Sequence, residues 1–176
     1  MTKLSRPDIS AARADAESLI ARFEINTAPV PVERIARRLD VQVRYAPLDG
    51  DLSGMAYIAE GVRIIGVNSL HHSTRQRFTL AHELAHICRH EDILQDAVHL
   101  DRGSLRRDWL STQGTDPYEQ EANAFASSLL MPRVLLEAIV GERVIDLEDD
   151  DAIGVLARRF RVSQAAMRFR LMQYGH

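Results

Sequence analysis

Apolar residues in the first part of the chain follow two successive spacings, which predict helices and then strands. Spacing typical of one helix face predicts helices over residues 8–24 and 32–39. Alternation of apolar and polar residues predicts three strands, over residues 41–45, 55–59 and 62–67. The last two strands are separated only by Glu60 and Gly61, which predicts a hairpin. Together the three strands predict a small, twisted sheet.

The second part of the chain is dominated by helical spacing. This spacing predicts five helices, over residues 73–90, 116–131, 133–140, 152–161 and 163–174. Two of the helix starts carry capping signals: Ser73 with Gln76 has the pattern of a capping box, and Asp116 precedes a first-turn proline. Residues 91–115 are polar and only weakly periodic, so they predict a long connection that is functional or contains short elements.

These elements predict an α+β fold. A three-stranded sheet packs on the helix over 73–90 and on the helix over 116–131, and the last two helices form a helix-turn-helix-like subdomain. Residues 146–151 are acidic and predict a linker together with the start of the next helix. We therefore expect a main domain over residues 1–145 and a C-terminal helical subdomain over 146–176.

Composition and charge exclude several classes of protein. The formal net charge of −3 is not that of a polycationic nucleic-acid binder. A single cysteine, Cys88, excludes an internal disulfide and is compatible with a reducing compartment. The N-terminal residues lack the apolar core of a signal peptide, and no run reaches the length of about 18 apolar residues that a membrane span needs. The sequence predicts a soluble, cytoplasmic protein with no membrane partner.

Residues His82, Glu83 and His86 form an H-E-x-x-H pattern inside the predicted helix over 73–90. Residues four apart lie on one face of a helix, so both imidazoles can reach one metal ion. Glu83 lies beside them and can accept a proton, which is the arrangement of a zinc hydrolase. The pattern therefore predicts one catalytic zinc ion, with Glu83 as the catalytic residue.

A catalytic zinc site also needs a third protein ligand and an open position. His90 is excluded beside His82, because the two lie eight residues apart, about 12 Å along the helix axis. Two candidates lie on the next helix, Glu119 and Glu121, in the order typical of gluzincins. Glu119 is favoured because Asn123, four residues later, can hydrogen-bond a ligand histidine. Glu121 stays the alternative ligand, although a charged residue of this kind more often lies at the surface as a solvated carboxylate.

Several segments resemble the ImmA/IrrE-type metallopeptidases. The resemblance rests on four segments, residues 77–86, 114–116, 119–126 and 129–132. It implies zinc held by His82, His86 and Glu119, and Glu83 as the base. It also implies that residues 1–145 are a metallopeptidase domain. The implied substrate is a regulatory protein, a DNA-binding repressor or an antitoxin-like partner.

Peptide hydrolysis also needs a group that stabilises the oxyanion. Three polar side chains are candidates by their position in the sequence: Tyr57, Tyr118 and His99. The strand over 55–59 is a candidate free edge that pairs with an extended substrate. The sequence does not indicate which of the three side chains stabilises the oxyanion.

Two other functions compete with the peptidase. Residues 156–167 resemble a helix-turn-helix, and several arginines make this stretch basic. The second possible function is therefore a DNA-binding regulator whose metal site is structural or senses a metal. DNA is not the favoured partner, because Ala166, Met167 and Leu171 give the second helix the character of a core helix. The third function is a toxin–antitoxin component that acts by binding alone. The sequence predicts no oligomeric state.

Overall fold

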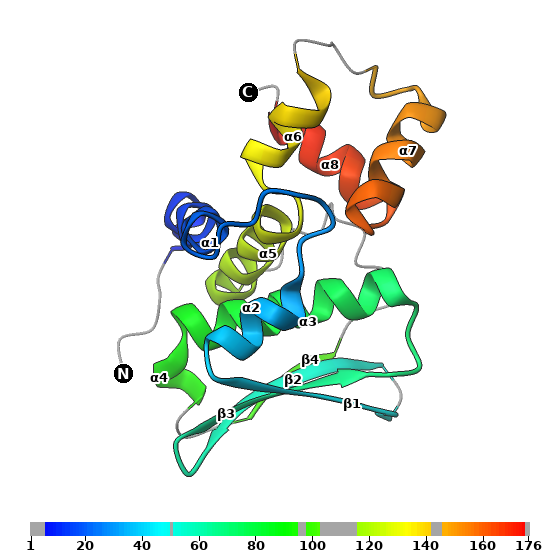
Figure 1. Ribbon diagram of the computed structural model, residues 1–176. Helices are drawn as coiled ribbons and strands as arrows, with labels where there is room; N and C mark the ends of the chain where they lie inside the picture. The colour runs from blue at the N-terminus through cyan, green and yellow to red at the C-terminus, as the bar shows by residue number, and fades with distance from the viewer. Residues whose placement is uncertain (1–5, 50, 95–97, 103–115, 142–145, 175–176) are drawn as a thin grey trace.

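The computed structural model describes residues 6–49, 51–94, 98–102, 116–141 and 146–174 of the 176-residue chain. Within these ranges the fold is α+β, with eight helices and one mixed sheet of four strands. Figure 1 shows the helices gathered on one face of the sheet, with the C-terminal helices farthest from it. The α+β class is therefore confirmed.

The sheet consists of β1 (Val41–Ala46), β2 (Leu52–Ala59), β3 (Val62–Asn68) and β4 (His99–Arg102) in the order β1-β3-β2-β4. Strands β1 and β3 are parallel, whereas β2 is antiparallel to both β3 and β4. The predicted hairpin between β2 and β3 is present. Glu60 and Gly61 both have positive φ, 53° and 77°, as the favoured two-residue hairpin turn requires.

Strand β4 corrects two predictions. The sequence predicted three strands, but residues 99–102 form a fourth inside the region predicted to be a connection. This strand pairs with β2, with Met55 opposite Leu100 and Ala56 opposite His99. The prediction that residues 55–59 are a free edge is therefore wrong for Met55 and Ala56, which pair with β4, and the described pairing ends at Ala56.

Helix α3 (Ser73–Arg89) lies between the sheet and α5 (Pro117–Leu130), which in turn packs on α1 (Ile9–Arg22). Because both sides of α3 are covered, every residue from Thr79 to Ile87 is buried. An apolar core of side chains from the sheet and these three helices surrounds it. The polar members of this buried run are therefore surrounded by protein and must find their partners there.

Of the two predicted helix caps, the one at α3 is wrong and the one at α5 is correct. His72, and not Ser73, caps α3 by accepting a hydrogen bond from the Thr74 N–H. Gln76 donates instead to the carbonyls of Ser69 and His71, so the predicted capping box is absent. Asp116 caps α5 as predicted, by accepting from the Tyr118 N–H at 2.9 Å.

The remaining helices are short. They are α2 (Val32–Arg38), α4 (Glu91–Leu94), α6 (Arg133–Val140), α7 (Asp150–Phe160) and α8 (Gln164–Tyr174).

Among the described helices, none is long and apolar enough by itself to cross a membrane, and α5 and α6 reach that length only as a pair bent by 41°. Arg161 separates α7 from α8 in a left-handed conformation, with φ of 55°. The helix-turn-helix character and the boundary at residue 146 stay predictions.

Candidate metal centre

Three side chains from two helices converge in the space between α3 and α5. His82 and His86 come from α3 and Glu119 comes from the first turn of α5. The two Nε2 atoms lie 3.2 Å apart, and each lies 3.4 Å from one oxygen of Glu119. Both histidines are almost fully buried, whereas the Glu119 side chain is 20 % exposed. The structure thus brings together the three ligands that the sequence favoured.

These separations match those of zinc ligands. Atoms bound tetrahedrally to one zinc ion at about 2.0–2.1 Å lie roughly 3.3–3.4 Å from one another. Burial lowers the pKa of His86 to about 3, so its imidazole is neutral and keeps a lone pair. Although burial opposes its charge, the neighbouring imidazoles of His82, His86 and His99 hold the pKa of Glu119 well below its ordinary value. Two imidazoles and one carboxylate are a donor set that fits zinc.

The orientation of His82 is fixed from α5. Its Nδ1 lies 3.0 Å from the Oδ1 atom of Asn123. An amide oxygen only accepts hydrogen bonds, so His82 donates through Nδ1 and leaves Nε2 with a lone pair. Asn123 therefore takes the supporting position that its spacing from Glu119 predicted.

The orientation of His86 is fixed by a relay that the sequence analysis missed. His86 Nδ1 lies 3.1 Å from Nδ1 of His90, and His90 Nε2 lies 3.1 Å from an oxygen of Glu121. A carboxylate only accepts, so His90 donates to Glu121 and accepts from His86. His86 then keeps Nε2 free. The second i,i+4 step, from His86 to His90, was the signal, but His90 was considered only as a direct metal ligand.

Glu121 is anchored away from the cluster. The prediction of a solvated surface carboxylate is wrong, because Glu121 is only 2 % exposed. One oxygen accepts from the Asp8 N–H at 2.7 Å, and the other accepts from Arg89 and His90. Although burial opposes its charge, these hydrogen bonds hold its pKa below the ordinary value. Among the described residues, the group able to hold a metal contains Glu119 and not Glu121.

Replacing His90 by phenylalanine is expected to weaken zinc binding by about 10- to 100-fold without changing the number of sites. Phenylalanine keeps the ring but removes both nitrogens of the relay, so His86 loses the group that fixes its orientation. Competition with a zinc-binding dye measures the affinity. His72→Asn is the matched control, because asparagine can also cap α3. An unchanged affinity in His90→Phe would contradict the role of the relay.

Glu83 and His99 complete the cluster. Glu83 is fully buried, and burial raises the pKa of its carboxyl group. Its Oε2 lies 3.1 Å from His99 Nδ1, whereas its Oε1 is buried without a hydrogen-bond partner. His99 Nε2 lies 2.9 Å from Glu119, and its ring stacks on that of His86 at 3.8 Å. Burial opposes the charge of His99, but its bonds to both carboxylates raise its pKa to about 10.

The two tyrosine candidates lie outside this arrangement. The ring of Tyr118 packs edge-on against His90, with the ring centroids 4.9 Å apart. Gly54 of β2 faces Glu83, and successive residues of a strand point to opposite faces. Tyr57, an odd number of residues from Gly54, therefore points away from α3. Of the three oxyanion candidates, the structure brings only His99 next to Glu83.

Gly54 allows the sheet to approach the helix that carries the cluster. A Cβ atom at this position would lie 2.4 Å from Thr79 Cγ2 and 2.9 Å from the Gly66 carbonyl oxygen. We expect Gly54→Ala to lower the free energy of unfolding by about 1–3 kcal/mol, because the backbone cannot yield. Chemical denaturation measures this change. Gly154→Ala is the control, because there the added Cβ meets the movable ends of Gln164 and Arg158. Equal stability of both variants would contradict the expectation.

Comparison with known proteins identifies a family and a structure of similar fold. The profile of the IrrE N-terminal-like domain, Peptidase_M78, matches residues 36–172. No curated protein matches the chain. Among solved structures, a transcriptional regulator of Mycobacterium tuberculosis matches with a TM-score of 0.55 and 15 % identity, over 90 % of this chain and 45 % of that one. This chain thus spans less than half of that regulator, and the likeness concerns the fold.

Proposed function

The chain belongs to the IrrE N-terminal-like domain family, Peptidase_M78, and from this membership and the metal cluster we propose that it is a zinc-dependent endopeptidase. The observation that carries the proposal is the set of three ligand atoms at zinc-like separations beside a buried carboxylate. His82, His86 and Glu119 would hold one zinc ion. Zinc bound there would lower the pKa of a coordinated water towards about 7 and polarise a peptide carbonyl.

Glu83 is the proposed base. Its Oε1 is buried without a hydrogen-bond partner and is therefore available as an acceptor, whereas Oε2 faces His99. Burial disfavours the charge on Glu83, which makes its carboxylate a better acceptor for a proton than an exposed one. After accepting the proton from the attacking water, Glu83 would deliver it to the nitrogen of the departing amine.

His99 is the proposed stabiliser of the oxyanion. Its ring nitrogens lie 3.1 Å from Glu83 and 2.9 Å from Glu119, so it lies beside both the proposed base and a proposed zinc ligand, where negative charge would develop. It also holds Glu83 in one orientation. The proposed substrate is a cytoplasmic regulatory protein, a DNA-binding repressor or an antitoxin-like partner. The resemblance to ImmA/IrrE-type peptidases supports this substrate class.

A second candidate is a DNA-binding regulator whose metal is structural or sensed. Exposed arginines at the end of α7 favour it, namely Arg158, Arg159 and Arg161. The similar M. tuberculosis structure is that of a transcriptional regulator, which is compatible with it. Against it, Ala166, Met167 and Leu171 of α8 are buried and cannot enter a DNA groove. A non-catalytic toxin–antitoxin component stays a third candidate.

Digestion of a peptide library by the zinc-loaded protein, read by mass spectrometry, tests the proposal. Cleavage that disappears on chelation and returns with zinc would support a peptidase. Absence of cleavage, together with a salt-dependent shift of duplex DNA, would favour the regulator instead. Binding of a partner that neither zinc nor Glu83 affects would favour the third candidate.

A further inference from the structure

Arg77 belongs to the motif segment of α3 but contacts none of the cluster residues. Its side chain is buried, at 7 % exposed, and its Nη2 donates to the carbonyl of Val30 at 2.9 Å. Its Nε is also buried but has no hydrogen-bond partner. Burial of a cation with an unused donor costs free energy unless a partner compensates it. The proposed peptidase chemistry does not use this group.

A hollow of about 350 Å³ lies beside Arg77. It is lined by Glu33, Tyr45, Ser73, Gln76, Arg77 and Arg161. Arg161 brings a second guanidinium from the turn between α7 and α8, and its charge adds to burial in lowering the pKa of Arg77. The two guanidiniums face only one carboxylate, and that of Glu33 already accepts a hydrogen bond from the Tyr45 hydroxyl at 3.1 Å. The lining therefore carries a formal charge of +1.

We propose that this hollow, the Arg77–Arg161 pocket, binds a small anion through a single phosphate group. Guanidinium groups bind phosphate oxygens through paired, charge-assisted hydrogen bonds. The volume lies at the lower end of the range of about 300–1,000 Å³ that small-molecule pockets occupy. The carboxylate of Glu33 repels highly charged ligands, which favours one phosphate group over a polyphosphate.

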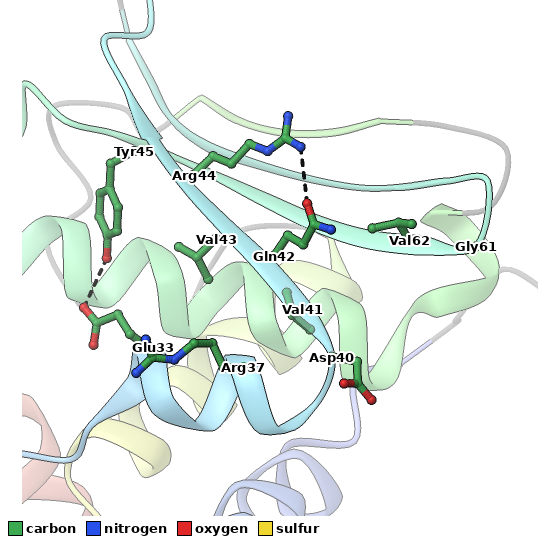
Figure 2. Close-up of a pocket in the computed structure, with 10 residues that line it drawn as sticks. All are labelled: Glu33, Arg37, Asp40, Val41, Gln42, Val43, Arg44, Tyr45, Gly61 and Val62. Atoms are coloured by element: carbon green, nitrogen blue, oxygen red, sulfur yellow. Dashed lines mark hydrogen bonds between the residues drawn. The ribbon is translucent and has the colours of Figure 1, made fainter.

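The surroundings favour an ester of phosphate as well as the free ion. A larger groove of about 840 Å³ runs along β1 and α2 and shares Glu33 and Tyr45 with the pocket. Figure 2 shows this groove, with the Tyr45 ring directed towards Glu33 at one end. The organic part of a phosphate ester has room there, beside Arg37 of α2.

The ligand would join three parts of the chain. The pocket receives side chains from α2 and β1, from the first turns of α3, and from the turn before α8. A phosphate bound by both arginines would hold the C-terminal helices on the helix that carries His82 and His86. The Arg77–Arg161 pocket is thus a binding site for a small-molecule signal, and it is separate from the metal cluster.

Titration of the zinc-loaded protein with inorganic phosphate tests the proposal, with phenyl phosphate and acetate as parallel probes at constant ionic strength. Arginine Nε–H resonances in NMR spectra report the pocket directly, so that phosphate on the metal does not interfere. We expect a saturable shift of the Arg77 resonance with phosphate. A tighter fit of phenyl phosphate would identify an ester as the ligand class, and a tighter fit of the free ion would identify phosphate itself.

Arg161→Gln is expected to weaken this binding by about tenfold, since it removes one charged donor pair from an exposed position. Arg34→Gln is the matched control, because Arg34 is exposed on α2 and does not line the pocket. The proposal is overturned if phosphate does not saturate, if both variants weaken binding equally, or if acetate binds as tightly as phosphate.

Discussion

Glu83→Gln is expected to lower peptidase activity by about 10²- to 10⁴-fold while zinc stays bound. This range is the usual contribution of a positioned general base. Glutamine keeps the size of the side chain and can present its oxygen to His99, but its amide cannot accept a proton. Because Glu83 is not one of the three ligand residues, the metal content should not change. Single-turnover cleavage of the best library peptide measures the loss.

Glu91→Gln is the matched control for this experiment. Glu91 is half-exposed at the start of α4 and pairs with Arg63 at 3.0 Å, and surface ion pairs contribute little to stability. Its activity should equal that of the unmodified protein. If Glu83→Gln retained full activity with zinc bound, the peptidase mechanism would be wrong and a binding function would explain the cluster better.

The second large effect is expected in metal content. The unmodified protein should hold about one zinc ion per chain, and His82→Ala and Glu119→Gln should each lose most of it. Removal of one ligand must lower the zinc affinity by more than the 10- to 100-fold that is lost when a residue supporting a ligand is replaced. Elemental analysis after dialysis against a weak chelator distinguishes the two levels.

Glu121→Gln separates the two candidate third ligands. Its carboxylate is engaged by Asp8, Arg89 and His90, so this variant should keep its stoichiometry and lose only affinity. If Glu119→Gln retained zinc while Glu121→Gln lost it, the assignment of the third ligand would be reversed. If no variant, nor the unmodified protein, bound zinc, the proposed function would fail.

The parts of the fold that were predictable depend on short-range patterns. Helices α3 and α5 follow from apolar spacing, and His82 and His86 follow from an interval of four residues on one helix. Asn123 was found for the same reason, since its spacing from Glu119 is also four. These features need no knowledge of the tertiary structure.

The parts that were missed depend on contacts between distant segments. Strand β4 has four residues and is defined by pairing with β2, more than 40 positions earlier, which no local pattern reveals. Glu121 is charged and was therefore expected at the surface. Its burial depends on donors from Asp8 and Arg89, which lie 113 and 32 residues away. His99 was named as a candidate from the sequence, but its position beside Glu83 was not predictable, because it depends on β4.

The Asp8 N–H that reaches Glu121 has a consequence for the whole N-terminal segment. Three successive hydrogen bonds lead from this amide through Glu121 and His90 to His86. Asp8 is also the residue that caps α1, so anchoring that helix and aligning the imidazole depend on the same residue. Metal retention would therefore change if a fusion, proteolysis or a binding partner loosened the chain before Ile9, even with every proposed ligand intact.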